Sequence, residues 1–155
     1  MAFGTLSVKG RALRYLSQRE HSRGELETKL ARHVEDTTDA PARQQIALAL
    51  DDLTARGFIS EARVAESVLT AKAARFGAFR LKQLLHSKGL SQELITSTLQ
   101  QAQASGFERA AALWQRRFGT LPAQAKERAR QMRFLAGRGF AGDIIRRVLN
   151  PPEAD

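Results

Sequence analysis

Apolar side chains recur along most of the chain at the three- and four-residue spacing of α-helices, while the period-two alternation typical of strands is hard to find. The clearest stretch has Ile46, Leu50 and Leu53 at positions i, i+4 and i+7, which places all three on one helical face. Leu26 and Leu30 share a face in the same way one helix earlier. The pattern therefore predicts an all-α protein.

The helix that contains Leu26 has a recognisable start. Ser22 is followed three residues later by Glu25, which is the spacing of a capping box. In this motif the serine hydroxyl accepts a hydrogen bond from one backbone N–H at the helix start, and the glutamate accepts one from another. We therefore expect the helix to begin directly after Ser22.

A helix-ending pattern occurs three times along the chain. Segments 53–58, 85–90 and 135–140 each read Leu, two residues, a cation, Gly and a large apolar residue. Glycine adopts the left-handed conformation that ends helices, the cation faces the negative end of the helix dipole, and the apolar residue can pack back on the last turn. Apolar residues five, six and ten positions after the glycine also agree between the second and third copies. The chain is therefore expected to contain repeated helical units.

These helix ends divide the chain into three repeats of about three helices each, near 8–58, 59–105 and 106–150. Two prolines prevent a helix at 151–155, which we interpret as a flexible tail. Units of this helix-turn-helix-like kind, stacked in tandem, usually form an elongated, curved body with a long surface for a partner. The expected fold class is therefore all-α, with three tandem three-helix repeats in an elongated, curved arrangement.

The charge of the chain narrows the choice of partner. The 155 residues include 25 Lys and Arg against 16 Asp and Glu, a formal net charge of +9. This excess favours nucleic acid, an acidic protein surface or a membrane surface as partner, although charge can also serve solubility alone. The chain has no cysteine, no apolar stretch of signal-peptide length at its start and no run long enough to span a membrane. We therefore expect a cytoplasmic protein with no membrane partner.

The sequence gathers no residues typical of catalysis or metal binding. His21, His33 and His86 lie on different predicted helices, with no pair at metal-ligand spacing. Glu20, His21 and Ser22 are triad residue types, but adjacent residues cannot form a nucleophile, a base and an orienting group. No glycine-rich phosphate loop is present either. We expect a protein that is not an enzyme, with no cofactor, metal or small-molecule substrate.

Two stretches carry many cations and hardly any carboxylates. Residues 72–88 contain five Lys and Arg and no Asp or Glu, and residues 109–138 contain eight against Glu127 alone. A solvated helix face normally mixes both signs, so we expect these stretches to face an acidic partner, even though some of the guanidiniums must be structural. The candidate partner- or DNA-facing residues are Arg75, Arg80, Lys82, Arg116, Arg117, Arg128, Arg130 and Arg133.

The single tryptophan has two interpretations. Trp114 lies at helical spacing with Phe107, Ala111 and Phe118, and such stripes are usually part of a core. The alternative is that its ring docks a partner or stacks on a base. Aromatic residues are only 6% of the chain, which is too few for a typical single-strand stacking surface.

Four blocks of the sequence carry a more specific pattern. Block 12–26 reads ALRYLSQREHSRGEL, and block 53–65 joins a Leu…Gly helix end to an acidic-x-Arg-x-Ala segment. Block 77–90 reads Gly-x-x-x-Leu-x-x-x-Leu-x-x-Lys-Gly-Leu, and block 138–149 forms the last predicted helix. In this order, and over essentially residues 8–150, they resemble the RecX family of regulatory proteins.

The resemblance implies tandem three-helix repeats, binding to the RecA filament on DNA, and modulation, mainly inhibition, of RecA recombinase, ATPase and co-protease activity. It thereby implies a role in DNA repair, DNA recombination and the SOS response. Glu61 stands where the family commonly has Asp, and Val64 where it generally has an aromatic residue, which affects local side-chain contacts more than function. The family has no catalytic residues to transfer, and the matching positions are expected to be chiefly architectural. They are Ser22, Glu25, Leu26, Gly57, Arg63, Gly77, Gly89 and Gly139.

Two functions follow as hypotheses. In the first, the basic faces lie along the groove of the RecA–DNA filament and block its extension or the rearrangement of its subunits. In the second, the chain is a helix-turn-helix-type protein that acts by direct DNA binding. Salt separates the two, because direct phosphate binding weakens linearly in log affinity with log salt concentration.

Overall fold

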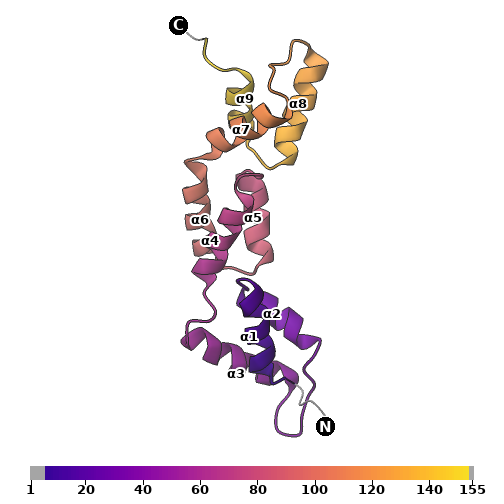
Figure 1. Cartoon of the computed structure of the whole chain (residues 1–155), viewed down its shortest axis with the longest axis vertical. Coiled ribbons are helices and arrows are strands. Elements are labelled where there is room, and N and C mark those ends of the chain that lie inside the picture. The colour runs from indigo at the N-terminus through magenta and orange to yellow at the C-terminus, as the bar shows by residue number, and fades with distance from the viewer. Residues whose placement is uncertain (1–5, 154–155) are drawn as a thin grey trace. The chain divides into compact units, whose positions relative to one another are not determined.

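The computed structural model describes residues 6–153, and within that range all regular secondary structure is α-helical (Figure 1). The helices of this part of the chain are α1 (Val8–Gln18), α2 (Arg23–Ala31), α3 (Ala42–Ala55), α4 (Glu61–Lys72), α5 (Ala78–Ser87), α6 (Gln92–Gln103), α7 (Gly106–Arg117), α8 (Ala125–Gly137) and α9 (Gly142–Leu149). The expected all-α fold class is therefore confirmed.

The chain divides into two compact units. The first unit runs up to Val64 and includes Lys88–Leu90, and the second contains Ala65–Ser87 and the chain from Ser91 onward. Helices α1 to α3 belong to the first unit, α5 to α9 belong to the second, and α4 is divided between them after Val64.

The repeat boundaries near 8–58, 59–105 and 106–150 stay a prediction. The tail that the prolines predict at 151–155 ends outside the described residues, which stop at 153.

In the first unit, α1, α2 and α3 enclose one apolar core. Its buried side chains are Ala12, Leu26, Leu30, Ile46, Leu50, Leu53 and Ile59. The leucines of α2 and the three apolar residues of α3 are those whose spacing predicted one helical face each, so the pattern is confirmed here. Burial of these faces against one another supplies the apolar contacts that hold the three helices together.

The predicted capping box at the start of α2 is present. The Oγ atom of Ser22 accepts a hydrogen bond of 3.1 Å from the Glu25 N–H, and the Ser22 N–H donates one of 3.2 Å to Glu25 Oε1. Arg19 Nη2 and Lys88 Nζ lie 2.7 and 3.2 Å from Glu25 Oε2. Partial burial alone would raise the pKa of Glu25, but the hydrogen bonds from Arg19, the Ser22 N–H and Lys88 lower this pKa to about 2. Glu25 is therefore a fixed negative charge at the positive end of α2.

The three predicted helix ends share one backbone conformation. Gly57, Gly89 and Gly139 have φ angles of 81°, 73° and 89°, in the left-handed region that favours glycine. At the first of them, the N–H of Phe58 donates a 2.9 Å hydrogen bond to the Leu53 carbonyl, which closes a Schellman motif. The repeated helix-stop pattern is therefore confirmed as a repeated structural feature.

The apolar residue after each of these glycines does not always pack as expected. Leu90 and Phe140 are buried, with 7% and 3% of their surface exposed, but Phe58 is 48% exposed. The next residue, Ile59, takes the buried position in the core of the first unit instead. Phe58 is therefore not part of this core, unlike the apolar residues after the other two glycines.

In the second unit, one cluster of buried side chains lies among α7, α8 and α9. Its members are Ala110, Leu113, Leu135, Phe140, Ile145, Val148 and Leu149. Helices α5 and α6 contact each other and bury Leu81, Leu85 and Ile95.

Two glycines bring the start of α5 onto the end of α8. The Gly77 N–H donates to the Arg138 carbonyl at 2.8 Å, and the Phe79 N–H donates to the Gly139 carbonyl at 3.1 Å. A Cβ atom on Gly77 would lie 2.5 Å from the Gly139 oxygen, and one on Gly139 would lie 2.5 Å from the Arg80 nitrogen. The backbones can therefore meet only because both positions lack a side chain, and both glycines have the architectural role that the resemblance implied.

Candidate partner-binding surface

The two units differ in how their charges are balanced. The first contains 11 Lys and Arg against nine Asp and Glu, and the second contains 14 against seven. The ion pairs of the first unit are Lys9–Asp52, Arg19–Glu25, Arg23–Glu27, Arg23–Asp51, Arg56–Asp52, Arg63–Glu20 and Lys88–Glu25. Among the described residues of the second unit the only ion pair is Arg130–Glu127, at 3.1 Å. The positive charge that remains for a partner is therefore concentrated on the second unit.

Several of these arginines stack on phenylalanine rings in one continuous series. Arg138 lies 5.2 Å from the ring centre of Phe134 and 5.9 Å from that of Phe76, so it joins two rings. Arg117 lies 5.9 Å from the Phe134 ring and 5.6 Å from the Phe118 ring. We call the whole series the arginine–phenylalanine seam. Its members are Arg75, Phe76, Arg80, Arg117, Phe118, Arg130, Phe134 and Arg138.

The seam follows from helical spacing on α8. Arg130, Phe134 and Arg138 are four residues apart, so they lie on one face of the helix. The ring of Phe118, at the end of α7, meets the edge of Phe134 at 5.4 Å and an angle of 89°. At the other end of the seam, Phe76 lies between α4 and α5. A guanidinium within about 6 Å of a ring is attracted to its face, so each arginine is held in place without losing its charge.

The backbone beneath Phe76 is fixed by another arginine. The Arg109 guanidinium donates hydrogen bonds to the carbonyl oxygens of Ala73, Phe76 and Ala102, and its Nε donates to Ser105 Oγ at 3.0 Å. Burial lowers the pKa of Arg109. This cation of the 109–138 stretch therefore holds three chain segments together and is not a partner-facing residue.

The seam contains half of the residues that the sequence singled out. Arg75, Arg80, Arg117 and Arg130 belong to it, and Arg138 is a further member that was not among the candidate residues. The missed signal was the placement of phenylalanine four residues from arginine, which occurs at 75/79, 76/80, 130/134 and 134/138 and gives stacked pairs at 76/80 and 134/138.

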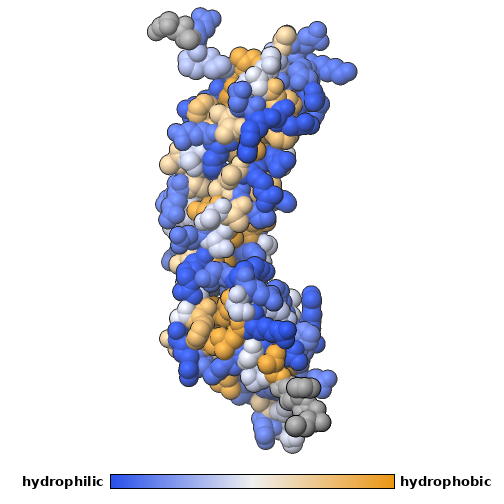
Figure 2. Space-filling model, viewed as in Figure 1, coloured by the Kyte–Doolittle hydropathy of each residue, from blue (hydrophilic) through white to orange (hydrophobic). Residues whose placement is uncertain are grey.

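The other four candidate residues lie elsewhere on the second unit. Lys82 lines a pocket of about 360 Å³. Arg128 donates a 3.1 Å hydrogen bond to Asn150 Oδ1. Arg116 and Arg133 are exposed on α7 and α8. Figure 2 shows hydrophilic side chains over much of the visible surface of the second unit, with small hydrophobic areas between them.

Trp114 has the core role that its spacing favoured. Its ring packs against the buried cluster of the second unit. Its Nε1–H donates a 2.7 Å hydrogen bond to Oε1 of Gln131, which is only 2% exposed. The buried amide in turn donates to the Thr120 carbonyl at 3.2 Å. The indole is therefore oriented by the interior of the unit, and not by an outer surface.

His21 is a buried structural residue. Its Nδ1 lies 3.0 Å from the Arg19 carbonyl, and its Nε2 lies 2.8 Å from Lys29 Nζ. Burial lowers the pKa of this histidine, so it is neutral at pH 7, with Nδ1–H as donor and Nε2 as acceptor. Ser22 next to it serves α2 as a cap. These neighbours therefore act as structural groups.

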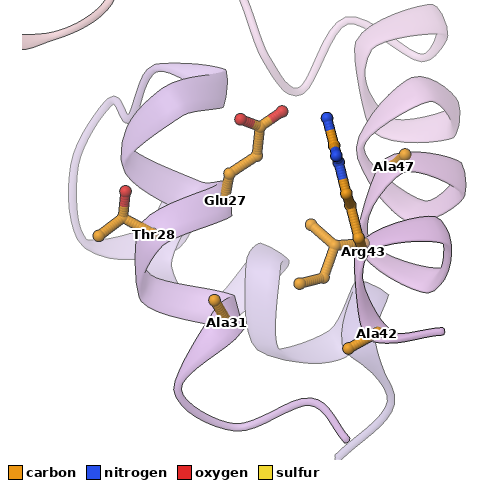
Figure 3. Close-up of a pocket in the computed structure, with 7 residues that line it drawn as sticks. Glu27, Thr28, Ala31, Ala42, Arg43 and Ala47 are labelled. Atoms are coloured by element: carbon orange, nitrogen blue, oxygen red, sulfur yellow. The ribbon is translucent and has the colours of Figure 1, made fainter. Parts of the chain in front are cut away.

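A pocket of about 530 Å³ lies between α2 and α3 of the first unit (Figure 3). Glu27 projects into it from α2 and Arg43 from α3, while Ala31, Ala42 and Ala47 offer only methyl groups. The two opposite charges balance, so the pocket has no net attraction for an acidic partner.

The fold and the seam together define a class of protein. It is a basic protein of helical repeats whose cations, on the second unit, lie mostly outside the ion pairs found in residues 6–153. Within the same residues, no helix has both the length and the apolar character that a membrane crossing requires.

Comparison with known proteins gives the family. Residues 9–39 match the family model described as RecX, first three-helix domain, and residues 104–149 match RecX, third three-helix domain. The regulatory protein RecX of Leptothrix cholodnii is 53% identical over 144 residues, which are 93% of this chain and 88% of the relative. That of Ralstonia nicotianae is 43% identical over 149 residues, 96% of this chain and 90% of the relative. The chain belongs to the RecX family of regulatory proteins, as its sequence blocks indicated.

The fold agrees with solved structures. The crystal structure of RecX from Lactobacillus salivarius matches with a TM-score of 0.74 at 22% sequence identity, over 92% of each chain. A second crystal structure of regulatory protein RecX matches with a TM-score of 0.69, over 91% of this chain and 70% of the other. The prediction of an all-α chain of helical repeats is thereby confirmed.

Proposed function

We propose that this chain binds the RecA filament assembled on DNA and restrains its recombinase, ATPase and co-protease activities, by binding alone and without catalysis of its own. The observation that carries the proposal is the concentration along the seam of arginines that, apart from Arg130, have no ion pair among the described residues. An array of fixed cations attracts an acidic surface and accelerates association with it. Membership of a family of regulatory proteins supplies the regulatory role, which we place in the cytoplasm during DNA repair, recombination and the SOS response.

The proposal is tested with single-strand-DNA-stimulated ATP hydrolysis by RecA at increasing concentrations of the chain. Binding of the chain to the same DNA without RecA is measured in parallel. Inhibition at concentrations far below those that coat naked DNA is the expected result. Inhibition that appears only where the DNA itself is coated would contradict the proposal and favour the direct DNA-binding alternative.

Charge reversal locates the surface. The triple variant Arg75→Glu, Arg80→Glu, Arg117→Glu alters the seam, and the matched control Arg14→Glu, Arg32→Glu, Arg43→Glu changes the same charge at exposed positions of the first unit. The seam variant is expected to lose inhibition and the control to keep most of it, with equal helicity by circular dichroism. Equal inhibition by both folded variants would rule out the seam as the binding surface.

The alternative of direct duplex binding predicts a different dependence on salt. Each phosphate that the chain neutralises on duplex DNA contributes a slope of about 0.9 in log affinity against log salt. The concentration of the chain that inhibits RecA should change with salt as steeply as its affinity for duplex DNA only if the chain acts through the DNA.

A further inference from the structure

Phe79 is the large apolar side chain that the second unit exposes most among its described residues, with 63% of its surface exposed. It lies in the first turn of α5, directly before the seam residue Arg80. Its backbone N–H donates to the Gly139 carbonyl at 3.1 Å, directly after the seam residue Arg138. The backbone that carries this exposed apolar ring is therefore fixed at the edge of a row of cations.

We propose that the seam and Phe79 together bind an acidic segment of a protein that also carries an apolar side chain, with its carboxylates on the arginines and its apolar side chain on the Phe79 ring. The inference rests on the proposed function, because it specifies that the surface meets the protein of the filament and not its DNA.

The stacking of the seam favours carboxylates as ligands. A guanidinium that lies over a ring still presents its N–H groups at the edge of its plane, and two of them match the two oxygens of a carboxylate. Arg117 and Arg138 each contact two rings, so their orientation is restricted before a ligand arrives. Preorganisation of this kind lowers the entropy lost on binding.

The same stacking disfavours a nucleic acid strand. Single strands bind where aromatic faces are open to bases. The rings of Phe76, Phe118 and Phe134 are all half-buried and already carry guanidiniums at 5.2 to 5.9 Å. Only Phe79 offers an exposed ring beside them, and one ring suits a single apolar side chain better than a row of bases.

The test is fluorescence anisotropy with the full chain and three labelled probes. The first is a short peptide in which Asp and Glu flank a central leucine, the second replaces that leucine by serine, and the third is an oligodeoxythymidine of equal net charge. The leucine peptide is expected to bind the most tightly of the three. An oligonucleotide that binds as tightly as the leucine peptide, or two peptides of equal affinity, would overturn the inference.

Variants assign the apolar contact. Phe79→Ser is expected to lower the affinity for the leucine peptide about tenfold and to leave the affinity for the serine peptide unchanged. The matched control is Leu48→Ser, because Leu48 is 62% exposed on α3 of the first unit, and its affinities should equal those of the original chain. Unchanged emission from Trp114 shows that Phe79→Ser keeps the fold of the second unit, and unchanged helicity by circular dichroism shows that Leu48→Ser is folded. An unchanged leucine-peptide affinity for folded Phe79→Ser would also overturn the inference.

The two proposals fail independently. The anisotropy assay contains no RecA. If the peptides do not bind as expected, the proposed inhibition of RecA is still tested separately by ATP hydrolysis. Conversely, tight binding of the acidic leucine peptide with no effect on RecA would support the peptide site and refute RecA as its partner.

Discussion

The guanidinium of Arg109 donates a hydrogen bond to the backbone carbonyl oxygen of Phe76, a residue that lies between α4 and α5. The same side chain donates to the Ala73 and Ala102 carbonyls at 2.7 and 2.8 Å. One side chain from α7 therefore donates to carbonyls just after α4 and at the end of α6, and at α6 it supplements the Ser105 N–H, which also donates to the Ala102 carbonyl. The position of Phe76 in the seam depends on this arrangement.

Replacing Arg109 by lysine should destabilise the second unit although it keeps the charge. An ammonium cannot reach three carbonyls spread across two helix ends, so at least one buried acceptor loses its donor. We expect a loss of about 2 kcal/mol in the free energy of unfolding, measured by urea denaturation. The control is Arg116→Lys at an exposed position on the same helix, which should change the free energy of unfolding by less than about 0.5 kcal/mol. Equal stability of the two variants would refute the structural role of Arg109.

Gly77→Ala should destabilise the chain by a steric clash. The new Cβ would lie 2.5 Å from the Gly139 oxygen, so the junction between α5 and α8 must shift and its hydrogen bonds must lengthen. We expect a cost of about 2 kcal/mol or more in the free energy of unfolding.

The matched control for that substitution is Gly137→Ala, in the last turn of α8. A Cβ there meets nothing within 4 Å. Alanine should therefore stabilise α8 by about 0.5–1 kcal/mol through its higher helix propensity. The two variants are compared by thermal denaturation. A higher melting temperature for Gly77→Ala than for Gly137→Ala would show that the backbones do not meet as described.

The charge of Glu25 should make stability depend on pH in the acid range. Its folded pKa of about 2 lies below the ordinary value of 4.5, so the carboxylate contributes its full stabilisation above pH 5 and loses it as the pH falls towards 2. Glu25→Gln should therefore be less stable than the original chain by on the order of 2 kcal/mol at pH 7, with the gap closing near pH 2. Denaturation with guanidinium chloride at several pH values measures the gap. The control is Glu27→Gln, at an exposed position of α2. A stability difference between Glu25→Gln and the original chain that does not change with pH would contradict the lowered pKa of Glu25.

The Trp114–Gln131 hydrogen bond can be followed by fluorescence, because the chain has a single tryptophan. Gln131→Leu leaves the indole N–H without its acceptor in the interior, at a cost of about 1–3 kcal/mol. We expect lower stability and a shifted Trp114 emission. Gln101→Leu at an exposed position of α6 should change neither quantity, and identical spectra for both variants would show that the amide does not hold the ring.

Most of the fold was predictable because its signals are local. The capping box at Ser22 involves residues three apart, and the stops at Gly57, Gly89 and Gly139 depend on one residue's backbone conformation. Each of these can be read from a few neighbouring positions. The exposure of Phe58 was not predictable in this way, because tertiary packing within the first unit places Ile59, and not Phe58, in the core.

The candidate surface was only partly predictable. Charge counting found the stretch that contains Arg117 and Arg130, but it could not separate Arg109, whose neighbours are carbonyls from other helices. It counted Arg138 but gave no reason to select it as a candidate, because the contact of this residue with Phe76 depends on the meeting of α5 and α8. Local sequence thus indicates which residues are charged, and tertiary structure decides which of them are free to act.

The meeting of α5 and α8 through Gly77 and Gly139 uses only main-chain atoms. Every amino acid except proline supplies the same N–H and carbonyl groups, so the joint makes no demand on the identity of the exposed side chains around it. Arginines and phenylalanines near the joint can therefore be exchanged for others without loosening it. Substitutions on a surface built on such a joint can therefore change which partner it binds while the backbone beneath it stays the same.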